Sequence, residues 1–123
     1  MAVEPDRIRR GAVVIVQLPE DNKAGRPAVV IRSDALAATP WVAVLPFTTD
    51  LDTDMPHWPR VEPTPENGLR QASRVMTDWP QTVWCRRIQG VAGRLDAASM
   101  ASATGLLAAA LGTGEAAGGD RGQ

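Results

Sequence analysis

The chain has 123 residues, a formal net charge of −1, one cysteine and one histidine. Its length suits one domain with a modest core, and the near-neutral charge argues against a protein that attracts nucleic acid through its overall field. One cysteine excludes an internal disulfide and a multi-cysteine zinc site, and no apolar run reaches the roughly 20 residues that span a bilayer. Residues 1–10 carry charges without an apolar stretch, so we expect a cytoplasmic protein with no secretory signal.

Apolar and β-branched runs separated by short turns predict a mainly β chain. After a loose arm over residues 1–8, strands are expected, in chain order, over residues 12–18, 27–32, 41–47, 58–62, 72–77 and 90–95. Prolines bracket the fourth of these strands, which is typical of a sheet edge. Residues 83–88 are expected to form a turn or a short helix.

The last element is predicted to be a helix that begins after Asp96 and ends at Gly112. Asp96 is a good N-cap, and glycine is common just past a helix C-terminus. Met100, Ala103, Leu107 and Leu111 recur at helical spacing and predict the buried face. We therefore expect a small, strongly bent antiparallel sheet, close to a barrel, with one C-terminal helix packed on it. The domain is expected to cover residues 1–112, with a disordered Gly- and Ala-rich tail over 113–123.

Polar groups stand at the ends of two neighbouring apolar strands. Arg26 comes just before the second strand, and Thr48 and Thr49 follow the third. If these strands pair antiparallel, Arg26 and Thr48 lie at the same edge of the sheet. A guanidinium beside a hydroxyl is well suited to hold a phosphodiester.

These stretches occur within an ordered set of motifs over roughly residues 8–112, and with them the chain resembles the MazF/PemK (Kid-like) family of toxin endoribonucleases. The motifs read Arg9-Arg10-Gly11-Ala12-Val13, Gly25-Arg26-Pro27-Ala28-Val29-Val30, Leu45-Pro46-Phe47-Thr48, Ser73-Arg74-Val75-Met76-Thr77-Asp78, Gln81-Thr82 and Arg87-Ile88. The resemblance implies the SH3-like barrel fold that this family shares with the gyrase poison CcdB.

The resemblance also implies roles for individual residues. Arg26 would stabilise the phosphorane, Thr48 would donate to a phosphate oxygen, and Asp78 would act in acid–base catalysis if burial raised its pKa. Without the resemblance these three residues read as a surface arginine and two turn residues. RNA contacts are expected from Lys23, Thr49, Trp58, Arg74, Trp79 and Gln81, the tryptophans by base stacking.

The remaining aromatic and nucleophilic side chains are expected to be structural. We expect Trp41 and Trp84 to pack in the core, His57 to lie in a solvated loop, and Cys85 to be inert.

By resemblance, the protein would be the toxin of a toxin–antitoxin pair, a homodimer that cuts single-stranded RNA sequence-selectively without metal or other cofactor. The products would be a 2′,3′-cyclic phosphate and a 5′-hydroxyl, and an antitoxin with an acidic disordered tail would block the RNA groove. Departures from the family pattern, Met76, Gln81 and a short loop over residues 20–25, leave open a catalytically weakened relative. A CcdB-like gyrase poison, which is not an enzyme, is a second alternative.

Overall fold

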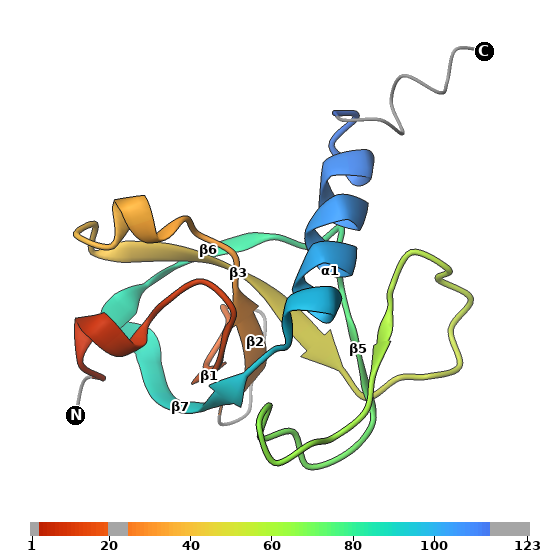
Figure 1. Ribbon diagram of the computed structural model, residues 1–123, viewed down its shortest axis with the longest axis horizontal. Coiled ribbons are helices and arrows are strands. Elements are labelled where there is room, and N and C mark those ends of the chain that lie inside the picture. The colour runs from red at the N-terminus through yellow and green to blue at the C-terminus, as the bar shows by residue number, and fades with distance from the viewer. Residues whose placement is uncertain (1–2, 20–24, 114–123) are drawn as a thin grey trace.

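The computed structural model describes residues 3–19 and 25–113, which form one curled antiparallel sheet and one long helix (Figure 1). The strands are β1 (Ala12–Val16), β2 (Arg26–Val30), β3 (Trp41–Thr48), β4 (Arg60–Val61), β5 (Ser73–Val75), β6 (Gln81–Trp84) and β7 (Ile88–Arg94). The helices are η1 (Pro5–Arg7), η2 (Asp34–Leu36), η3 (Cys85–Arg87) and α1 (Ala97–Ala110). This architecture confirms the predicted mainly β class with one C-terminal helix.

Strand β3 organises the sheet because three other strands pair with it. The strand order is β4-β5-β3-β2-β1-β7, and β6 pairs with β3 beside this path. The first half of β3 holds β6, its middle holds β2, and its end holds β5. Since β5 and β6 share one long strand, the sheet curls around β3 instead of remaining flat, and β4 lies at its edge as predicted.

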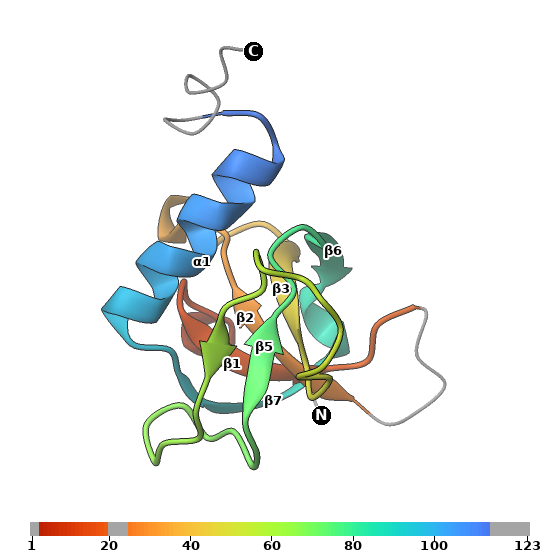
Figure 2. The same ribbon diagram turned by 90° about the vertical axis from the view of Figure 1, so that its right-hand side faces the viewer.

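Both faces of the central strands are buried, which explains the uninterrupted β-branched runs in the sequence. On one face Val14, Ala28 and Val44 pack with the N-terminal Ile8 and with Ile88. The other face is covered by α1 (Figure 2); the residues packed there include Val13, Val29, Leu45, Val75, Ala103 and Leu107. Alternate residues of each strand thus serve two separate apolar clusters.

Helix α1 begins and ends where the sequence predicts. The carboxylate of Asp96 accepts a hydrogen bond from the Ser99 amide at 3.0 Å, and Gly112 has a φ of +78° just past the last turn. Ala103 is fully buried, while Leu111, predicted for the buried face, is 64% exposed. Leu107 is the last helix residue that packs against the described core, and Leu111, one turn further on, is not covered by it.

In the described part of the chain one local prediction was wrong and another was correct only in part. The supposed loose arm contains η1, and Ile8 is 1% exposed because it closes one end of the core. Within residues 83–88 the structure has the end of β6, whose Val83 pairs with Val42, before the short helix η3. The predicted tail lies outside the described residues from 114 onward, and so does most of the loop over 20–25.

The glycines of β7 provide a matched test of packing. A Cβ on Gly93 would lie 2.2 Å from the Glu66 carbonyl oxygen, whereas a Cβ on Gly90 would meet nothing within 4 Å. We expect Gly93→Ala to lower the free energy of unfolding by about 2 kcal/mol or more, because backbone must move to make room. Gly90→Ala should be neutral or slightly stabilising. Urea unfolding measures both variants, and equal effects would contradict the packing described here.

Candidate functional site

The antiparallel pairing assumed for Arg26 and Thr48 is present. β2 and β3 pair with Val29 opposite Leu45 and Ala28 opposite Pro46. Continued by two residues, this register brings Arg26, the first residue of β2, opposite Thr48, the last residue of β3. Residues directly opposite each other in antiparallel strands project from the same face, so the two side chains share one face and one edge.

Strand β5 extends this row by one residue. Arg74 lies opposite Thr48 in the β3–β5 pair. Arg26, Thr48 and Arg74 therefore stand side by side on three neighbouring strands, which are spaced about 5 Å apart in a sheet. The Thr48 hydroxyl oxygen accepts a hydrogen bond from the Asp50 amide at 3.1 Å. Its own hydrogen remains available to a second partner, so a turn role and a phosphate contact are compatible.

Arg74 is buried and is committed to the protein, so we no longer assign it to RNA. The side chain is 8% exposed, and its guanidinium donates to the backbone carbonyls of Asp50, Thr53, Met55 and Trp58. It also lies over the Trp58 ring, 5.4 Å from the ring centroid. This one cation organises the loop between β3 and β4, which has no regular structure of its own.

Asp78 is held by two side chains from that loop. Its carboxylate accepts from the Trp58 indole at 2.7 Å and lies 3.0 Å from Nε2 of His57. Partial burial raises the pKa of Asp78, but the hydrogen bonds from Trp58 and His57 outweigh burial and bring the pKa below its ordinary value. The raised pKa expected of a general base is therefore absent, and the carboxylate stays ionised at neutral pH.

The predicted RNA-stacking tryptophans differ in their accessibility. Trp58 is 9% exposed, because Arg74 covers its ring and Asp78 binds its indole, so the stacking role proposed for it is not supported. Trp79 is 49% exposed and is available to a base. The expectation that Trp41 and Trp84 lie in the core was wrong, since they are 48% and 44% exposed.

The other residues predicted to contact RNA are Thr49, Gln81 and Lys23. Thr49 lines a cavity next to Thr48, and Gln81 lies opposite Val44 in the β3–β6 pair. Lys23 lies outside the described residues. Thus the structure brings Arg26, Thr48 and Thr49 to one edge, with Asp78 following β5 on the far side of β3.

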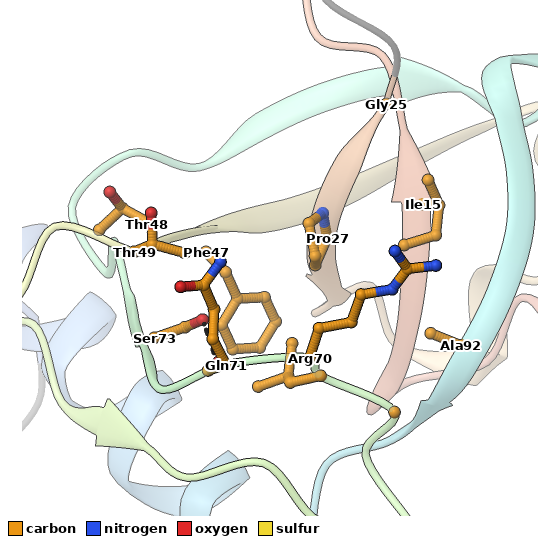
Figure 3. A pocket seen from close by; sticks show the side chains of 12 residues that line it. Ile15, Gly25, Pro27, Phe47, Thr48, Thr49, Arg70, Gln71, Ser73 and Ala92 are labelled. Atoms are coloured by element: carbon orange, nitrogen blue, oxygen red, sulfur yellow. Dashed lines mark hydrogen bonds between the residues drawn. The ribbon is translucent and has the colours of Figure 1, made fainter.

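A cavity of about 560 Å³ opens at the same edge of the sheet (Figure 3). It is lined by Pro27 from β2, by Phe47, Thr48 and Thr49 around the end of β3, and by the segment from Gly68 to Ser73. Arg26 is not among its lining residues, because it alternates with Pro27 and projects from the opposite face. Thr48 and Thr49 therefore lie at the boundary between this cavity and the row formed by Arg26, Thr48 and Arg74.

Arg70 is a cavity residue that the sequence did not single out. Its exposed side chain extends toward Ile15 of β1 in Figure 3, so a positive charge stands at the mouth of the cavity. In the sequence it is one arginine within a polar turn region, and nothing marks it. Gly68, two residues before it, has a φ of +69° and packs against the Ala92 backbone, which sets the path of this segment.

The fold and the polar strand ends define a class of small curled-sheet domains with one C-terminal helix. The profile of the family described as PemK-like, MazF-like toxin of type II toxin-antitoxin system matches residues 9–111. The chain belongs to this family.

Individual relatives agree with that assignment. A probable endoribonuclease MazF of Mycolicibacterium smegmatis is 44% identical over 71 residues, which span 57% of this chain and 64% of that relative, less than two thirds of its length. The Mycobacterium tuberculosis toxin MazF-mt6 has a TM-score of 0.70 at 24% identity, covering 85% of this chain and 99% of its own. An endoribonuclease from a mycobacterial species, solved with its cognate antitoxin, has a TM-score of 0.69 at 23% identity, covering 87% and 95%. These structures confirm the fold class.

The anchoring role of Arg74 leads to a stability prediction. Arg74→Met keeps most of the side-chain volume but leaves loop carbonyls without their donor, so we expect the free energy of unfolding to fall by about 3 kcal/mol. Arg60, opposite Arg74 on β4, is the control because its side chain is 56% exposed and pairs only with Glu62 among the interactions described. Arg60→Met should cause no measurable change in urea unfolding, since exposed ion pairs contribute little. Similar losses in both variants would contradict the anchor.

Proposed function

We propose that the protein is a sequence-selective, metal-independent endoribonuclease that cuts single-stranded RNA, and that it is the toxin of a toxin–antitoxin pair. The observation that carries this proposal is the alignment of Arg26 with Thr48 at one sheet edge. Membership of the toxin family supports it, as does a relative named as a probable endoribonuclease. We also propose a cytoplasmic location, because the proposed substrate is cellular RNA.

The proposed chemistry needs no nucleophile from the protein, because the 2′-hydroxyl of RNA attacks the adjacent phosphate. Arg26 then stabilises the charge that grows on the phosphate oxygens, because a guanidinium can donate two parallel hydrogen bonds to a phosphate. Thr48 donates its hydroxyl hydrogen to one of these oxygens. The products are a 2′,3′-cyclic phosphate and a 5′-hydroxyl. Since no water has to be activated, the reaction does not call for a metal ion.

RNA would be held by local features, since a net charge of −1 supplies no general attraction. Arg70 places a cation at the cavity mouth, and Thr49 offers a hydroxyl beside Thr48. The exposed ring of Trp79 follows Asp78 directly and offers a base a surface for stacking. Bases seated between these groups are the proposed origin of sequence selectivity.

An antitoxin is the proposed protein partner. A mycobacterial endoribonuclease has been solved with its cognate antitoxin, and MazF of Deinococcus radiodurans has been solved together with MazE. An acidic, partly disordered segment would complement Arg26 and Arg70 and would exclude RNA by occupying the same edge.

A homodimer is the proposed assembly, supported by the exposed end of β6. Trp41 and Trp84 pack edge to face, with ring centroids 5.6 Å apart, and remain half exposed. Leu36 nearby in sequence is 53% exposed. Among the described strands β6 pairs with β3 alone, so its outer edge is open to a second copy. A twofold axis at this edge would bury aromatic surface from both chains.

Cleavage of a long synthetic RNA in EDTA tests the proposed activity. The wild-type protein should produce discrete cuts with cyclic phosphate ends, and Arg26→Ala should slow them by about 10²-fold or more, because a donor to the developing charge is lost. Arg60→Ala serves as an exposed-arginine control and should cut normally. Intact RNA together with gyrase-dependent DNA breaks would indicate a gyrase poison. Intact RNA without toxicity on expression would indicate a weakened relative.

Sedimentation velocity tests the proposed dimer. Trp84→Glu should shift the protein from dimer to monomer, because a charge would have to be buried in the aromatic interface. Leu51→Glu, which places the same charge on another exposed apolar residue, should leave the dimer intact. A wild-type monomer, or dissociation in both variants, would contradict this interface.

A further inference from the structure

We propose that His57, held by Asp78, is a catalytic residue that protonates the departing 5′-oxygen. This inference rests on the proposed endoribonuclease function and adds a residue that sequence analysis assigned to a solvated loop. It also accounts for a gap in the proposed chemistry, because Arg26 and Thr48 stabilise charge but neither supplies a proton readily at neutral pH.

His57 is fixed in place without being enclosed. Its Nε2 lies 3.0 Å from Oδ2 of Asp78, whose Oδ1 is occupied by the Trp58 indole at 2.7 Å. The Thr77 hydroxyl donates to the His57 backbone carbonyl. The side chains of His57 and Asp78 are 37% and 35% exposed, so a bound substrate can reach the imidazole. A carboxylate that binds Nε2 orients the imidazole ring, and Nδ1 is then the nitrogen that a substrate would meet.

The pair is linked to the proposed phosphate site through Arg74. Arg74 stands next to Thr48 in the row that begins with Arg26, and its guanidinium lies over the Trp58 ring. Trp58 in turn binds Asp78 and lies next to His57 in the chain. Arg74 shares a face with Arg26 and Thr48 and contacts Trp58, so the His57–Asp78 pair is joined to the row through Arg74 and Trp58.

Two charged side chains lie near His57. Asp78 faces it from the turn after β5 as an ionised carboxylate, while the positive charge of Arg74 lies across the Trp58 ring and is bound by backbone carbonyls. As the 2′-oxygen bonds to phosphorus, the bond between phosphorus and O5′ breaks. The departing O5′ takes the proton from Nδ1 of His57. The 2′-hydroxyl proton passes to a solvent water. His57 is left neutral and regains its proton from solvent.

A substrate with sulfur in place of the bridging 5′-oxygen separates this role from a structural one. A thiolate leaves without being protonated, so the acid is needed only for the oxygen substrate. We expect His57→Gln to slow cleavage of the oxygen substrate by about 10²-fold or more and of the sulfur substrate by less than about threefold. Arg26→Ala should slow both, because the charge on the phosphate develops in either case.

Asp78→Asn tests the positioning carboxylate. Asp78→Asn should slow cleavage of the oxygen substrate more than cleavage of the sulfur substrate, because the imidazole is no longer held by a charged carboxylate and only the oxygen leaving group needs its proton. His57→Asn, a second variant that retains a donor toward Asp78, should repeat the kinetics of His57→Gln. Circular dichroism and urea unfolding show whether each variant is folded.

The outcomes distinguish the two levels of proposal. If the wild-type protein cuts RNA and both His57 variants are slowed equally on the two substrates, His57 is structural, and this inference fails while the endoribonuclease stands. If both variants cut the oxygen substrate at the wild-type rate, the inference also fails. If the wild-type protein cuts neither substrate, the proposed function itself fails and this inference fails with it.

Discussion

The structure depends on one constraint, which is that β3 must pair with three strands at once. Its eight residues pair with β6 at the start, β2 in the middle and β5 at the end. A flat sheet would not allow β3 to pair with β5 and β6 along one edge while it pairs with β2 along the other, so the sheet curls. The curled sheet encloses an apolar cluster on each face of its central strands. The same pairing aligns the polar ends of β2, β3 and β5, so that the proposed phosphate site follows directly from the way the core is built.

Arg74 connects that core to the proposed chemistry. A buried guanidinium is stable only where its donors find acceptors, and here the carbonyls of an irregular loop supply them. The loop is thereby ordered without secondary structure, and it carries Trp58 and His57 to Asp78. A residue that looks like an RNA contact in the sequence thus serves the site indirectly, by holding the segment that presents its neighbours.

Electrostatics in this protein are local. The net charge is close to zero, yet the sheet edge carries Arg26, and Arg70 stands at the mouth of the adjoining cavity. The hydrogen bonds that lower the pKa of Asp78 keep a carboxylate beside the only histidine of the chain. The pairing of Asp78 with His57 comes from neighbouring side chains, and a general field around the molecule would not produce it.

The sequence by itself determined six of the seven described strands, the helix with its Asp96 cap, and the shared edge of Arg26 and Thr48, because periodicity, capping and antiparallel pairing act over short distances along the chain. Tertiary structure alone decided which polar side chains are buried and which are paired. Arg74 and Trp58 became structural, Trp41 and Trp84 became exposed, and His57 met Asp78 across 21 positions of sequence. The physical reason is that burial and pairing depend on what folds over a side chain from elsewhere, and composition near a residue carries no record of that.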